Sequence, residues 1–106
     1  MGVLEKTAPL FSTLGRVVMT SGVSAEQDRD DDFRSFVSRS LARYMHKEWG
    51  ELGADDTRLN NLAVDGGDDR ILAAYDGTDR GSGQKKIWII TEWDRSVTTI
   101  LFPEEY

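Results

Sequence analysis

The sequence predicts a single α+β domain, in which two helices pack on a three- or four-stranded antiparallel sheet. The chain has 106 residues, a length that supports one modest core of two packed layers. Apolar residues recur at helical spacing between Phe33 and Trp49. Three runs in the last third of the chain are rich in β-branched residues and follow one another through short connections, as the strands of an antiparallel meander do.

The single domain spans residues 1–106. Its N-terminal part is predicted to contain an arm, a strand and the approach to a helix. Residues 1–14 have no sustained period and predict a loosely ordered arm. Residues 16–20 are rich in β-branched side chains and predict a candidate fourth strand of the sheet, which Ser21-Gly22 ends. The polar, acidic residues 24–32 predict a helix approach that contributes little to the core.

The longest predicted helix covers residues 33–49. Its apolar residues recur every three or four positions and so form one face, and Gly50 follows as a stop signal. The opposite face carries Arg39, Arg43 and His46, which predict a solvated basic stripe.

A second, shorter helix is predicted to begin at residues 55–56. Leu59, Leu62 and Ala63 have helical spacing and predict its apolar face, and the glycines at 66–67 suit a left-handed C-terminal cap. The chain then changes to strand-like runs separated by a Gly-rich loop and a tight turn. The three runs are residues 70–75, 86–92 and 96–102, with the loop at 76–84.

The composition excludes several kinds of site. The chain has no cysteine, which excludes disulfide frameworks, thiolate zinc sites and cysteine nucleophiles. It has a single histidine, His46, and therefore no histidine-rich metal cluster. We therefore expect no metal, no cofactor and no enzymatic activity. No apolar run approaches the roughly 18 residues of a membrane span, and the N-terminus has no signal-peptide core, so we expect a cytoplasmic protein that contacts no membrane.

The net charge of −6 is concentrated in one part of the sequence. Residues 1–50 hold equal numbers of acids and bases, whereas segment 51–69 holds six acids against Arg58 alone. A second acidic segment, residues 26–32, precedes the net-positive residues 33–50. The chain thus alternates acidic, basic and acidic blocks.

Two motifs resemble ligand sites without meeting their requirements. The Gly-rich loop 76–84 precedes a strand, whereas a phosphate-binding loop opens a helix, so it predicts a flexible hairpin connection. Asp65, Asp68 and Asp69 lack the alternating ligands and final Glu of a calcium loop, and they fit a helix end followed by a solvated loop.

The C-terminal run 87–106, Ile-Trp-Ile-Ile-Thr-Glu-Trp-Asp-Arg-Ser-Val-Thr-Thr-Ile-Leu-Phe-Pro-Glu-Glu-Tyr, resembles a family of short, uncharacterised plasmid- and phage-associated bacterial proteins. Residues 15–20 fit the same family, as do Trp49-Gly50, Asp55-Asp56 and Asn60-Asn61, although the family pattern leads us to expect Asp at position 61. The resemblance implies a setting, mobile genetic elements, in which small acidic proteins often inhibit host defence. By analogy it implies an anti-CRISPR or anti-restriction inhibitor.

We therefore expect a host-defence inhibitor whose acidic surface mimics DNA and occupies a basic nucleic-acid groove on a host protein or ribonucleoprotein complex. No direct contact with nucleic acid is expected, and the protein is expected to be a monomer or a homodimer. Exposed tryptophans at 49, 88 or 93 would anchor such an interface. The expected partner-binding residues are Glu51, Asp55, Asp56, Asp65, Asp68 and Asp69, together with Asp30, Asp31 and Asp32.

Two alternatives remain open at this point. Helices followed by a terminal meander look like RelE-type and barnase-like ribonuclease toxins, although such toxins are usually basic. In such a toxin His46 or Glu92 would move the proton. The basic and tyrosine residues that would handle RNA are Arg70, Tyr75, Lys85, Lys86 and Arg95. The other alternative is a structural or regulatory subunit that dimerises through the edge of the last strand.

Overall fold

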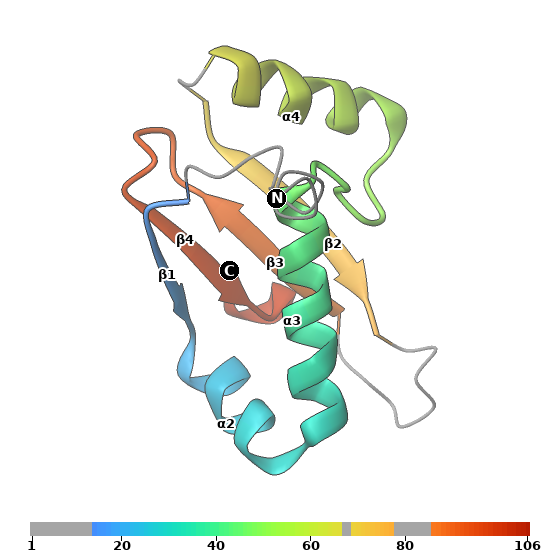
Figure 1. Ribbon diagram of the computed structural model, residues 1–106, viewed down its shortest axis with the longest axis vertical. Coiled ribbons are helices and arrows are strands. Elements are labelled where there is room, and N and C mark those ends of the chain that lie inside the picture. The colour runs from blue at the N-terminus through green and yellow to red at the C-terminus, as the bar shows by residue number, and fades with distance from the viewer. Residues whose placement is uncertain (1–13, 67–68, 78–85) are drawn as a thin grey trace, which may run out of the picture.

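The structure is a computed structural model in which residues 14–66, 69–77 and 86–106 are described. They form a four-stranded sheet and three α-helices, which confirms the predicted α+β class (Figure 1). The elements in chain order are β1 (Arg16–Met19), α2 (Ser21–Arg29), α3 (Asp31–Met45), α4 (Ala54–Gly66), β2 (Ile71–Asp76), β3 (Lys86–Thr91), β4 (Val97–Leu101) and the 3-10 helix η2 (Pro103–Glu105). The predicted N-terminal arm, apart from Leu14, lies outside the described residues.

The sheet is mixed, whereas an antiparallel sheet was predicted. Its strand order is β1-β4-β3-β2, and the C-terminal strands form the expected antiparallel meander. Strand β1 is the fourth strand, but it pairs with β4 in parallel. Three helices and two strands separate β1 from β4 in the chain, so no hairpin turn forces the two strands to run antiparallel. Because β1 pairs with β4, the last strand is not an edge of the sheet, and the prediction that it offers a free edge is wrong.

Helix α2 corrects the prediction that residues 24–32 form only a helix approach. The Thr20 side chain accepts a hydrogen bond from the Val23 N–H (3.3 Å) and caps the N-terminus of α2. Asp30 then ends α2 and caps α3, because its side chain accepts bonds from the N–H groups of Asp32 (2.9 Å) and Phe33 (3.3 Å). The described residues thus form one more α-helix than predicted. Cap residues at both ends stabilise α2, although this segment has no apolar face.

Helix α3 covers one face of the sheet and buries the face that its periodicity predicts (Figure 1). Phe33, Phe36, Val37 and Tyr44 are all buried. The helix ends at Met45, four residues before the predicted end at Trp49, because Lys47 adopts a left-handed backbone conformation with φ 66°.

A chain of hydroxyl groups crosses this core. The Thr98 hydroxyl donates to the Leu14 carbonyl (2.7 Å), so it can only accept from the Thr91 hydroxyl, which lies 2.7 Å away. Thr91 in turn accepts from the Tyr44 hydroxyl (2.7 Å). The donors therefore all point one way, from α3 through β3 and β4 to Leu14, two residues before β1. None of the helices among the described residues is long and apolar enough to cross a membrane.

Candidate functional site

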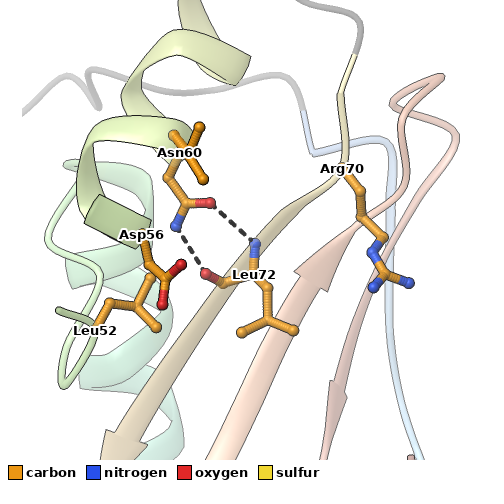
Figure 2. A pocket seen from close by; sticks show the side chains of 6 residues that line it. Leu52, Asp56, Asn60, Arg70 and Leu72 are labelled. Carbon is orange, nitrogen blue, oxygen red and sulfur yellow. Dashed lines mark hydrogen bonds between the residues drawn. The ribbon is translucent and has the colours of Figure 1, made fainter. Parts of the chain in front are cut away.

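Helix α4 is fastened to the edge of the sheet by one buried amide. The Asn60 side chain donates from Nδ2 to the Leu72 carbonyl (2.7 Å) and accepts at Oδ1 from the Leu72 N–H (3.4 Å), as Figure 2 shows. It thus satisfies both backbone groups that β2 turns away from β3 at this residue. An edge strand closed in this way offers no free ladder to another chain at that point.

The segment before α4 closes the same edge two residues further along. Glu51 N–H donates to the Ala74 carbonyl (2.8 Å), and Ala74 N–H donates to the Trp49 carbonyl (3.3 Å). The indole N–H of Trp49 donates to Asn61 Oδ1 (3.1 Å). Asn61 therefore serves as an acceptor, a role that needs no charge.

Arg95 fixes the C-terminal end of α4. Its guanidinium donates to the carbonyls of Ala63 in the last turn of α4 (2.7 Å) and of Asp69 just before β2 (2.6 Å). A cation at the C-terminal end of a helix also interacts favourably with the helix dipole. The middle and the C-terminal end of α4 are thereby held against the sheet by polar contacts rather than by a large apolar face.

Helix α4 buries Ala63 as predicted, but it is rotated so that the other two residues of its predicted apolar face, Leu59 and Leu62, lie outside the core. Asn60 and Ala63 face the sheet, whereas Leu59 and Leu62 are 58% and 59% exposed. Full burial of a leucine side chain stabilises a fold by about 1.5–3 kcal/mol. Because Leu59 and Leu62 stay more than half exposed, each contributes only part of that stabilisation. The pairing of Asn60 with Leu72 sets the rotation of the helix and turns both leucines outward.

The acidic residues of segment 51–69 lie over this helix and its flanks. Asp55 pairs with Arg58 (3.6 Å) and Glu51 pairs with Lys86 (3.4 Å), both at the surface, where ion pairs contribute little. Within the described part of the chain, no ion pair involves the other three carboxylates. The exposed members are Glu51, Asp55, Asp56, Asp65 and Asp69, and Asp68 lies outside the described residues.

The second acidic segment lies at the opposite end of the molecule, around the junction of α2 and α3 (Figure 1). There Asp30 is the helix cap already described, Asp31 pairs with Arg34 (3.2 Å) and Asp32 is exposed in the first turn of α3. The structure thus brings the described acidic residues of segment 51–69 together, and it places those of segment 26–32 far from them.

A pocket of about 310 Å³ lies between α4 and β2. Figure 2 shows Asp56 and Leu52 on its α4 side, Arg70 on the far side, and Leu72 between them. The guanidinium of Arg70 lies over the ring of Tyr106, 5.5 Å from the ring centroid. The lining residues are Leu52, Asp56, Leu59, Asn60, Arg70 and Leu72. Sequence reasoning missed this pocket, because it selected the carboxylates for their charge and assigned the leucines to the core.

The three tryptophans expected as anchors have different surroundings. Trp49 is buried in the core and Trp88 is half-buried with its ring against Tyr106 (5.5 Å between centroids). Only Trp93, in the turn between β3 and β4, is exposed, with 64% of its surface accessible. The prediction of an exposed anchor is therefore wrong for Trp49, which instead packs edge-on against Tyr44.

The residues of the ribonuclease alternative are spread over the fold. Tyr75 is buried and donates its hydroxyl to the Glu48 carbonyl (2.6 Å), and Arg95 is bound to backbone carbonyls. Arg70 and Tyr75 lie near opposite ends of β2. His46 ends α3 with its Nδ1 2.9 Å from the Ala42 carbonyl oxygen, and Lys85 lies outside the described residues.

Most of the Gly-rich loop 76–84 also lies outside the described residues, as does Asp68 of the calcium-like motif. Among the residues that are described, no three acidic or histidine side chains lie close enough together to hold a metal ion. No protein-family model, no curated protein and no solved structure matches the chain.

Proposed function

We propose that the protein is a non-enzymatic inhibitor that binds a nucleic-acid-handling complex of host defence through the acidic surface of α4. In this proposal the carboxylates of α4 and its flanks occupy a basic site that DNA would otherwise fill. Binding excludes the nucleic acid by charge and by bulk, and it weakens as salt is added. The defence machinery is of the CRISPR or restriction type, as the resemblance to plasmid- and phage-associated proteins implies.

The observation that carries this proposal is the exposure of the carboxylates of segment 51–69. All five members within the described residues are exposed, and they gather over one helix at one end of the molecule. These carboxylates lie on a rigid support, because the hydrogen bonds of Asn60 and Arg95 hold α4 to the sheet. A rigid array of like charges complements a basic groove without a large loss of conformational entropy.

A plating assay with two matched charge reversals tests the proposal. Asp55 and Asp56 occupy the first turn of α4, and Asp31 and Asp32 occupy the first turn of α3 at the other end of the molecule. Each pair changed to Lys alters the net charge by the same four units and removes the same favourable contact with a helix dipole. The two double variants therefore differ in location and in little else.

We expect expression of the wild-type protein to raise the plating of phage on a host that carries a CRISPR or a restriction system. Reversal of Asp55 and Asp56 should abolish that effect, and reversal of Asp31 and Asp32 should leave it intact. Thermal unfolding followed by circular dichroism checks that both variants fold. Full activity of the α4 variant, or no effect of the wild-type protein on either host, would contradict the proposal.

A further inference from the structure

The surface of α4 is apolar as well as acidic. Leu59 and Leu62 project from the helix among the carboxylates, and Leu59 also lines the pocket toward β2. A surface that only imitated the phosphates of DNA would need the carboxylates and not the leucines. Two leucines exposed by more than half, one helical turn apart, form an apolar strip that a protein partner can bury.

The pocket is large enough to hold a side chain of a protein partner. Its volume of about 310 Å³ lies at the lower end of the range of roughly 300–1,000 Å³ that holds small molecules and cofactors. Leu52, Leu59 and Leu72 supply apolar walls from three separate segments of the chain. The pocket therefore suits one or two aliphatic or aromatic side chains of a partner.

The charged residues around the pocket indicate which partner residues fit beside an apolar side chain bound in it. Asp56 stands at the rim, and Asp55 precedes it in the first turn of α4. Arg58 pairs with Asp55 (3.6 Å), so the cation of a partner is attracted mainly to Asp56. Arg70, at the far side, lies over the Tyr106 ring and away from Asp56 (Figure 2). A partner residue that enters the pocket is thus best flanked by Lys or Arg on the α4 side.

From these contacts we infer that the pocket and the outer face of α4 bind a basic amphipathic helix of a protein partner. Such a helix presents apolar residues three and four positions apart, next to Lys or Arg, and packs its apolar face into a groove. One apolar residue enters the pocket, a second packs on Leu62, and the cations meet Asp55 and Asp56. This inference rests on the proposed function and names the partner chemistry that the acidic surface selects.

Two synthetic peptides test the inference by fluorescence anisotropy. The probe is a labelled helix of leucine and lysine with leucines at positions i, i+3, i+4 and i+7, and its control has every leucine replaced by glutamine at unchanged charge. We expect the wild-type protein to bind the leucine peptide at least about tenfold more tightly than the glutamine peptide. The double variant Leu59→Ser and Leu62→Ser should lose that preference. Val17→Ser, a change at another exposed apolar residue, on β1, should keep it.

The outcomes separate this inference from the proposed function. Equal binding of the two peptides, no binding of either, or an unchanged preference in the leucine double variant would overturn the inference, while the plating assay still judges the charged surface. Loss of the preference in the leucine variant alone, with binding unchanged after Asp55 and Asp56 are reversed, supports the pocket and counts against the carboxylates. Because both leucines are more than half exposed, their replacement by serine should leave the fold intact, which thermal unfolding verifies.

Discussion

Two neighbouring asparagines of α4 have opposite chemical requirements. Asn60 both donates to and accepts from the backbone of Leu72, so it needs an amide. Asn61 accepts from the Trp49 indole N–H, and a carboxylate oxygen would serve as well. Nothing in the spacing of the sequence distinguishes the two, because the distinction lies in strand β2, which meets the helix only after folding.

Substitution of each asparagine by aspartate tests this difference with the same change of charge and almost the same shape. Asn60→Asp removes the donor to the Leu72 carbonyl and places a carboxylate against it, which should lower the free energy of unfolding by about 2–3 kcal/mol. Asn61→Asp should change it by less than about 0.5 kcal/mol. Urea unfolding followed by tryptophan fluorescence measures both values. Equal losses in the two variants would argue against the pairing of Asn60 with the edge of β2.

At the scale of elements, the connection between α3 and α4 depends on Gly50. This residue has φ 78° and forms an isolated parallel bridge with Ala74 of β2. A Cβ added to Gly50 would collide with the Ala74 carbonyl oxygen and the Tyr75 ring, whereas one added to Gly53 would meet nothing within 4 Å. The same loop thus holds one glycine that the fold requires and one that it does not.

Gly50→Ala should lower the free energy of unfolding by about 2–4 kcal/mol, because it combines a strained backbone with a collision against the strand. Gly53→Ala should be neutral or stabilise the protein by up to about 1 kcal/mol, since alanine reduces the conformational entropy of the unfolded chain. Thermal and urea unfolding of the two variants provide the comparison. A mild effect at Gly50 would mean that segment 49–51 does not lie against β2 as described.

The elements differ in how far the sequence predicts them. Helix α3 and strands β2 to β4 follow from apolar periodicity, because each buries a broad face. Helix α2 buries only Val23 and was missed, although Thr20 and Asp30 are cap residues that could have marked its ends. The rotation of α4 had no local signal, since one buried amide outweighs the two leucines that periodicity would place inside.

The whole molecule separates its two acidic segments by the length of α3 (Figure 1). The charge pattern of the sequence marks 51–69 as an acidic segment, and its described acidic residues are exposed, because charged side chains rarely enter a core. The charge pattern could not show that segment 26–32 lies at the far end, nor that a pocket with leucine walls adjoins the carboxylates. Both depend on how α3 and α4 pack against the sheet, which neither charge nor spacing encodes.

Two buried tyrosines connect the layers of the molecule. Tyr44 of α3 donates to Thr91 of β3, and Tyr75 of β2 donates to the Glu48 carbonyl after α3 (2.6 Å). Burial raises the pKa of both phenols above the ordinary value of 10.0, and this outweighs the opposing effects of the Arg95 charge at Tyr44 and of Arg43 beside Tyr75. Each phenol therefore keeps its proton to higher pH in the folded protein than in the unfolded chain.

This difference makes the stability of the whole fold sensitive to alkali. The contribution of the two protonated phenols is fully present below pH about 10, and it is lost as the pH rises further, because the unfolded chain gives up its tyrosine protons first. We expect the free energy of unfolding to fall steadily above pH about 10. The double variant Tyr44→Phe and Tyr75→Phe should be less stable at pH 8 by about 1–3 kcal/mol, since it loses the hydroxyl bonds, yet its stability should fall less steeply above pH 10. Urea unfolding at intervals between pH 8 and pH 11 measures both curves, and parallel curves would show that other groups cause the loss.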